Sequence, residues 1–151
     1  MEGSAADKLT RRQAVAACES LLRILHTAVD CFGGDLDQIV IYLSVATAST
    51  TAALRDPEAV ADITEVGLPD AYHRPISRRA IAASTGLPRE TVRRKIAELV
   101  TAGRLVEEAR GVRTRSGVLN EGRNLEFVRA LLREIERSAA NLARMRKESA
   151  D

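Results

Sequence analysis

Residues 77–119 read SRRAIAASTGLPRETVRRKIAELVTAGRLVEEARGVRTRSGVL, and this stretch decides the fold that we expect for the chain. Ser77 is a favourable N-cap for a first helix, which should end at Ser84 or Thr85. Gly86 follows directly and supplies a tight turn. The stretch therefore begins with a short capped helix and a glycine turn.

A second helix and a hairpin complete this stretch. Pro88 occupies the first position of the second helix, a position that tolerates proline, and the helix should run to about Ala102. Two short strands are expected at 105–108 and 112–115, on either side of Arg110-Gly111. The order of parts is helix, turn, arginine-rich helix and basic hairpin.

The N-terminal part of the chain predicts two more helices. Residues 7–31 should form a helix, because apolar residues recur at spacings of three and four, and Gly33-Gly34 ends it. Another helix should start at a cap on Asp35 or Asp37 and continue to about Leu54. It is apolar nearly all round, so we expect it to be buried as the central strut of the domain.

The remaining segments are a connection and a terminal helix. Asp56-Pro57 should end the preceding helix, and residues 56–75 should form an exposed acidic connection with one helical turn over 58–64. Residues 121–147 should form a long helix. We therefore expect a mainly α-helical chain with a small β-hairpin. Its central domain (35–119) lies between an N-terminal helical segment (1–34) and a C-terminal one (120–151).

Composition and charge restrict the class of protein. With 151 residues, 45% of them hydrophobic, the chain fits one compact domain. It has no long apolar run, and its N-terminus lacks the apolar core of a secretory signal, so we expect no membrane span and a cytoplasmic location. The formal net charge is −6 over 1–73, +7 over 74–115 and +1 over 116–151. Attraction to phosphates depends on such a local basic patch.

Residues that could carry catalysis or hold a metal are few. Cys18 and Cys31 would lie about 20 Å apart on one helix, which excludes a disulfide between them, and we expect both to be small core residues. His26 should be a core or interface residue and His73 a solvated loop residue. The sequence contains no phosphate-binding glycine loop, metal-ligand motif or nucleophile motif. We therefore expect no enzyme activity, no metal and no cofactor.

Helix 88–102 has two distinct faces on a wheel of 100° per residue. Val92, Ile96 and Leu99 lie together and define the face toward the core. The opposite face carries Glu90, Arg94 and Ala97, with Arg89 and Arg93 on one flank. Arginine can bond to guanine and glutamate to cytosine, so this face suits base edges in DNA. The alternative is a solvated ladder of ion pairs, in which Arg94 pairs with Glu90 and Glu98.

The segments IAASTGL (81–87), RETVRRKI (89–96) and LVTAGRLV (99–106) together resemble the winged helix-turn-helix regulators of bacteria, particularly the GntR, MarR and IclR types. The resemblance covers about 45 of the 151 residues. It implies that helix 88–102 enters the major groove and that wing residues 110–115 lie along the minor groove. The 20-residue connection before Ser77 is longer than these families usually have.

The resemblance and the charge pattern together predict a DNA-contacting surface. Arg78 and Arg79 stand at a helix start, where the dipole disfavours cations, and a phosphate would offset this. An aromatic content of 3% without Trp favours duplex DNA over single strands. The residues expected to contact DNA are Ser77, Arg78, Arg79, Arg89, Glu90, Thr91, Arg93, Arg94, Lys95, Arg110, Arg113 and Arg115.

The C-terminal helix predicts self-association. Its apolar residues follow 3-4 spacing over three heptads, with charges on the flanks, as in a helix that packs along another helix. We expect a homodimer whose interface includes Leu21, Leu25, Leu125, Val128, Leu132, Ile135 and Leu142. The alternative is that the two terminal helices pack only on each other within one chain.

These features lead to one expected function and two alternatives. We expect a homodimeric, sequence-specific duplex-DNA-binding regulator of transcription that reads a pseudo-palindromic site. The alternatives are a winged-helix module that contacts an acidic protein and an architectural DNA-binding protein without sequence preference. A small-molecule effector, if one exists, is not specified by the residues, although the resemblance suggests a pocket between helix 35–54 and the dimer helices.

Overall fold

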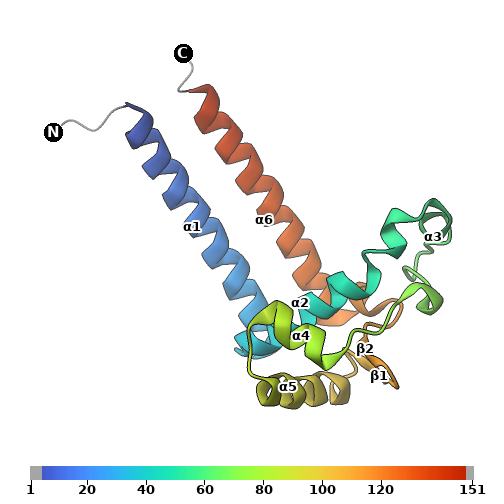
Figure 1. Ribbon diagram of the computed structural model, residues 1–151. Coiled ribbons are helices and arrows are strands. Elements are labelled where there is room, and N and C mark those ends of the chain that lie inside the picture. Colours follow the sequence, from blue (N-terminus) through green and yellow to red (C-terminus); the bar gives the residue numbers. More distant parts are fainter. Residues whose placement is uncertain (1–4, 149–151) are drawn as a thin grey trace.

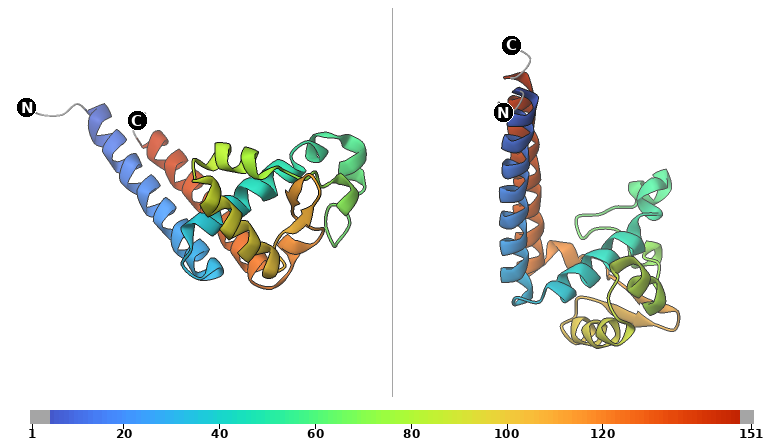
Figure 2. Two further views of the ribbon diagram at one scale, coloured as in Figure 1. Left: turned by 60° about the horizontal axis from the view of Figure 1, so that its bottom comes forward. Right: turned by 60° about the vertical axis from the view of Figure 1, so that its left-hand side comes forward.

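The computed structural model describes residues 5–148 as a mainly helical protein with one small antiparallel β-hairpin (Figure 1). The long helices α1 (Ala5–Phe32) and α6 (Gly122–Lys147) lie side by side and form an arm that projects from a more compact body. Figure 2 shows the arm from two further sides. The start of α1 and the end of α6 lie together at its far end, so the two helices run antiparallel (Figure 1).

The core of the body lies where three helices and the hairpin meet. The helices are α2 (Leu36–Thr50), α4 (Arg78–Thr85) and α5 (Arg89–Thr101). Their fully buried side chains are Ile41, Tyr42 and Val45 of α2, Ile81 of α4, and Val92, Ile96 and Leu99 of α5. The predicted core face of the helix that follows Pro88 is therefore confirmed.

Local capping explains where these helices begin. The Asp35 carboxylate accepts a hydrogen bond from the Gln38 amide, and the Ser77 hydroxyl accepts one from the Ala80 amide. Gly86 ends α4 in the left-handed conformation, with φ of 71°. Pro88 is the cap rather than the first residue of α5. All these boundaries follow from residues adjacent in sequence.

The hairpin is tied to the start of α4. Strand β1 (Val106–Glu108) pairs with β2 (Gly111–Arg113), and both are shorter than predicted. Ile76 and Val112 exchange two backbone hydrogen bonds of 2.8 and 3.0 Å. A Cβ atom on Gly111 would lie 2.1 Å from the Ile76 carbonyl oxygen, so only glycine permits this approach.

Helix α2 is shorter and less buried than predicted. It ends at Thr50 rather than near Leu54. At this end the hydroxyls of Thr50 and Thr51 donate to backbone carbonyls one turn back. Leu36, Val40 and Leu43 are 51%, 43% and 37% exposed, since α4 and α5 cover only the other side of α2. The helix is therefore a strut with one open apolar face.

The connection over 56–75 is folded rather than simply exposed. It contains α3 (Pro57–Ala61), capped by Asp56, and the 3₁₀ turn η2 (Asp70–Tyr72). The 3₁₀ turn η1 (Ala53–Arg55) precedes it, and η3 (Val118–Asn120) follows the hairpin. Ala53, Ala59 and Leu68 are buried together, with Tyr72 packed on them. The predicted helical turn over 58–64 is thus displaced toward Pro57, because Asp56 supplies the cap.

An aromatic cluster joins the arm to the body. The Phe32 ring lies 5.2 Å from that of Tyr42 and 6.0 Å, edge to face, from that of Phe127. The Arg104 guanidinium lies 4.0 Å from the Phe32 centroid and donates to the Cys31 carbonyl at 2.8 Å. This cluster fixes α1 and α6 against α2. Cys31 is buried as predicted, whereas Cys18 is exposed on the arm, contrary to the prediction.

Within the arm, a buried polar cluster lies at the middle of the contact between the two helices. Glu134 is 9% exposed and Ser20 is 7% exposed. The Arg23 Nε donates to Glu134 Oε1 at 2.9 Å, and Arg137 Nη2 donates to Oε2 at 2.5 Å. Burial raises the pKa of Glu134, but the hydrogen bonds from Arg23 and Ser20 and the nearby arginine charges lower it more, so the net pKa is below its usual value.

The apolar stripe predicted for contact lies outside this polar cluster. Leu132 and Ile135 are 54% and 51% exposed, and Leu21 is 56% exposed. Leu25, Leu125, Val128 and Leu142 are half-buried. His26, expected in a core or an interface, is exposed in this chain. No helix within residues 5–148 has the length and apolar character needed to cross a bilayer.

Candidate functional site

Helix α5 presents one face to the core and the other to solvent. Val92, Ile96 and Leu99 are fully buried against the body. Successive residues of a helix are 100° apart, so Arg94 projects from the opposite side, whereas Arg89 lies on a flank in the first turn; both are exposed. In Figure 1 and in the right-hand view of Figure 2, α5 lies at the end of the molecule remote from the tip of the arm. Its outer face is therefore accessible along its length.

Four exposed arginines are unpaired around this helix. Across residues 11–148, no hydrogen bond or ion pair is formed by the guanidinium groups of Arg79, Arg89, Arg94 and Arg110. Arg79 belongs to the first turn of α4, and Arg110 belongs to the hairpin turn. Unpaired arginines repel one another and gain most from an external anion.

Two further predicted residues are paired but remain exposed. Arg93 bonds to Glu90 at 2.5 and 2.9 Å, and the hydrogen bond from Arg93 lowers the pKa of Glu90. Arg78 pairs with Glu107 of β1, which holds the start of α4 beside the hairpin. Since these pairs are exposed, each is worth little and can open for another partner. The predicted Glu90–Arg94 and Arg94–Glu98 ladder does not form.

Lys95 has a structural role instead. Its side chain is 13% exposed and bonds to Asp35 and, at 3.0 Å, to Glu98. Burial raises the pKa of Asp35, but the hydrogen bonds from Lys95 and the Gln38 amide lower it below its usual value. Lys95 therefore anchors α5 to the start of α2. It was predicted to contact DNA together with Arg89 and Arg94, but it does not belong to the exposed basic face that these arginines form.

The side chains of Ser77 and Thr91 contribute less. The Ser77 hydroxyl is used as the cap of α4, as described above, although the residue is exposed. Thr91 is half-buried in the first turn of α5. Both lie near the unpaired arginines in sequence.

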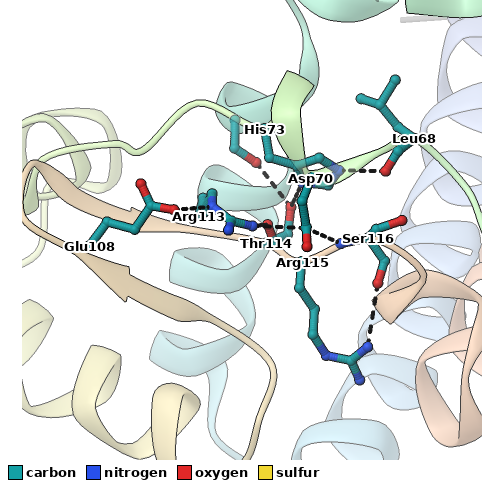
Figure 3. Close-up of polar contacts among 9 residues, drawn as sticks. Leu68, Asp70, His73, Glu108, Arg113, Thr114, Arg115 and Ser116 are labelled. Atoms are coloured by element: carbon teal, nitrogen blue, oxygen red, sulfur yellow. Dashed lines mark hydrogen bonds and ion pairs between the residues drawn. The ribbon is translucent and has the colours of Figure 1, made fainter. Parts of the chain in front are cut away.

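Arg113 and Arg115 are engaged within the protein (Figure 3). Arg113 is 14% exposed and pairs with Glu108 at 2.5 Å and with Asp70 at 2.9 Å. Arg115 lies beyond the hairpin and pairs with Glu121 of the loop before α6. These contacts withdraw both guanidiniums from the face that carries Arg110.

A polar network connects the hairpin to the folded connection. Asp70 accepts hydrogen bonds from Arg113 and, at 2.7 Å, from the Ser116 amide (Figure 3). The Ser116 bond and the Arg113 charge hold the pKa of Asp70 below its usual value, against the opposing effect of burial. His73 bridges the Thr114 hydroxyl at 3.0 Å and the Leu68 carbonyl at 3.1 Å.

The sequence interpretation missed this network and placed His73 in solvent. His73 is half-buried, and Thr114, its partner, is 2% exposed. The partners stand about forty residues apart in the chain, so no local pattern joins them. The only sequence signal is an unusually long connection, which is uncommon in a compact domain unless it is functional.

The arrangement of the exposed arginines fits anion binding. Over residues 5–148, no group of three or more His, Cys, Asp and Glu side chains lies together as a metal site would require. The exposed basic face contains guanidinium groups, which donate to phosphates and base edges. Comparisons with protein-family models, with curated proteins and with solved structures find no match for this chain.

Proposed function

We propose that the chain is a winged helix-turn-helix protein that binds duplex DNA as a homodimer and regulates transcription in the cytoplasm. In this proposal α5 is the recognition helix, and β1 and β2 form the wing. The proposal extends the sequence resemblance, and the basic face of α5 is the observation that carries it.

The shape and charge of α5 support docking in the major groove. An α-helix with side chains is about 10–12 Å wide, which matches the width of the groove. Arg94 lies unpaired on the outer face and Arg89 lies unpaired on its flank, and Arg93 and Glu90 can exchange their mutual bond for contacts to bases. Arg79 in the first turn of α4 and Arg110 in the hairpin turn suit phosphate contacts. Lys95, Arg113 and Arg115 are left out, because their charges are neutralised within the chain.

The arm supports dimerisation because its two faces differ. On α6, Arg133 and Ile135 lie on opposite sides of the buried Glu134, since successive residues are 100° apart. Arg133 lines a polar groove shared with α1, so Ile135 belongs to the other face. The same argument applied to α1 places Arg23 in the groove and Leu21 on the other face.

The apolar face of the arm is therefore continuous across both helices. Its exposed large residues include Leu21, Leu132 and Ile135. Exposed apolar surface of this kind in a small protein marks an interaction site. A second copy, placed with its arm parallel by a two-fold axis that runs along the arm, would cover the stripe with an identical one. It would also present two copies of α5 to one DNA site.

A binding selection tests the proposal. The purified full chain is incubated with random 30-base-pair duplexes at near-physiological salt, and the retained duplexes are sequenced. We expect a motif with two-fold symmetry and half-sites one helical turn apart. Retention without a motif would favour architectural binding, and no retention even at low salt would favour a protein-binding module.

A salt titration then locates the surface. Each neutralised phosphate contributes about −0.9 to the slope of log affinity against log salt. If Arg89 and Arg94 each neutralise one phosphate in both protomers, their replacement by Gln should reduce the slope by about 3.6. The matched control is Arg55→Gln with Arg133→Gln, which removes the same charge from exposed positions outside the face. Equal slopes for the two double variants would place DNA binding elsewhere.

A further inference from the structure

A cavity of about 200 Å³ lies behind the hairpin, between the end of α2, the folded connection and the loop that follows β2. Its apolar wall is formed by side chains from all three parts: Ala46, Leu54, Ile63, Val66, Leu68 and Leu119. Three long-range segments therefore build it, and it differs from the pocket expected between α2 and the dimer helices.

The cavity walls are held together by specific contacts. The Asn120 amide donates to the Val66 carbonyl at 2.9 Å and to the Glu65 carbonyl at 3.3 Å. Gly67 and Gly117 face each other closely, since a Cβ on Gly67 would lie 3.6 Å from the Gly117 nitrogen. The connection is thereby fastened to the loop before α6. A cavity fastened in this way is formed before any ligand arrives, as ligand sites usually are.

The walls expose apolar surface that the protein itself does not cover. Leu54, Ile63, Val66 and Leu119 are 52%, 42%, 62% and 41% exposed, and all four line the same cavity. Convergence of four such side chains on one hollow favours an apolar occupant, because its burial removes their surface from water. The volume suits a molecule smaller than a typical drug.

The cavity lining carries a cation and no acid. It includes Arg115 and contains no Asp or Glu. His73 also lines the cavity, but both ring nitrogens are already bonded, to Thr114 and to Leu68. Arg115 is half-buried, and its partner Glu121 is exposed outside the lining, so an incoming anion can replace it. The available polar group is therefore a guanidinium at the edge of an apolar hollow.

We propose that this cavity is a binding site for a small apolar carboxylic acid, with its hydrocarbon part against Leu54, Ile63 and Val66 and its carboxylate on Arg115. Ligand binding itself does not depend on the proposed function, but the effect of the ligand on the wing rests on it. Thr114 and Arg115 continue directly from β2, and Asp70 joins Arg113 to Ser116. An acid that displaces Glu121 from Arg115 therefore acts on the segment that positions the wing.

The test is a titration of the full chain, without DNA, followed by two-dimensional amide NMR. The probes are hexanoate, 1-hexanol and hexylamine, which share one hydrocarbon chain and differ in charge. We expect saturable shifts confined to residues 46–54, 63–73 and 112–121. Hexanoate should bind at least roughly tenfold more tightly than the other two, because a charged hydrogen bond to Arg115 is added.

Variants separate the two parts of the site. Arg115→Gln should remove the preference for hexanoate and keep the binding of hexanol. Ala46→Phe should fill the cavity and abolish binding of all three probes. If this variant unfolds, Val66→Trp serves instead, because it blocks the cavity from the exposed position of Val66 at its opening. Equal affinity of the parent for the three probes, shifts on the arm instead, or unchanged binding in the filled variants would overturn the proposal. The DNA selection described above fails or succeeds independently of these results.

Discussion

Replacing Leu132 and Ile135 by Gln should dissociate the proposed dimer and leave the protomer folded. Full burial of a Leu or Ile side chain stabilises by about 1.5–3 kcal/mol, and these two are 54% and 51% exposed in the single chain. About half of that energy, roughly 1 kcal/mol each, is thus left for an interface. Two-fold symmetry doubles the two positions to four side chains, so the dimer should lose about 4 kcal/mol. This corresponds to a roughly thousandfold weaker dimer dissociation constant.

Sedimentation equilibrium over a wide range of protein concentrations measures this constant directly. The control is Arg133→Gln with Ala140→Gln, which adds the same number of glutamines to the polar face of the same helix. We expect the control to dimerise as the parent does, and both variants to keep the helical circular dichroism of the parent. A parent that is monomeric at every concentration, or a Leu132/Ile135 variant that dimerises as tightly as the control, would refute the reasoning about the arm.

Three further predictions concern the body of the protein. Gly111→Ala should cost about 2 kcal/mol or more of unfolding free energy, because its Cβ would meet the Ile76 carbonyl oxygen, whereas Gly103→Ala, with open space around it, should cost about 1 kcal/mol. Urea unfolding of the two variants checks the difference, and equal losses would contradict it. Tyr42→Phe should be neutral or stabilising by about 1 kcal/mol, because the buried hydroxyl has no hydrogen-bond partner among the described residues. Burial also raises the pKa of Tyr42 to about 12, so a thermal melt at pH 7 compares neutral side chains, and a clear loss of stability would reveal a partner. Asp70→Asn should destabilise the protein at pH 7, because the contacts that lower the pKa of Asp70 stabilise its ionised carboxylate. The difference should disappear as the pH falls below the ordinary Asp value of 3.8 and the carboxylate becomes protonated. A difference that persists unchanged at pH 2 in denaturant titrations would argue against that ion pair.

Local signals in the chain predicted most element boundaries. The Ser77 cap, the Gly86 turn and the core face of α5 all depend on residues within one or two helical turns of each other, and the structure confirms them. The hairpin around Arg110-Gly111 was also predicted, although its strands are shorter. Such features need no information about distant parts of the chain.

The site was only partly predictable, since pairing changes what a charged residue can do. The sequence grouped Lys95, Arg113 and Arg115 with Arg89 and the other arginines of the basic face. The structure neutralises these three through acids that lie far away in sequence or in loops whose folding was not expected. A charge pattern counts cations, but it does not reveal which of them already has a partner.

The arm shows the same limit for apolar residues. Periodicity correctly identified two long amphipathic helices and the stripe that contains Leu132 and Ile135. It could not reveal that α1 and α6 would place Glu134, Ser20 and Arg23 in their contact and leave that stripe exposed.

The sequence by itself determined the helices, the turns, the hairpin and the inward face of α5, because capping, glycine conformation and hydrophobic spacing act between near neighbours. Only the tertiary structure decided which arginines stay unpaired, which face of the arm stays open, and that a folded connection encloses a cavity beside Arg115. These outcomes depend on contacts between residues far apart in the chain, and the free energy of each contact exists only once the whole fold brings its partners together.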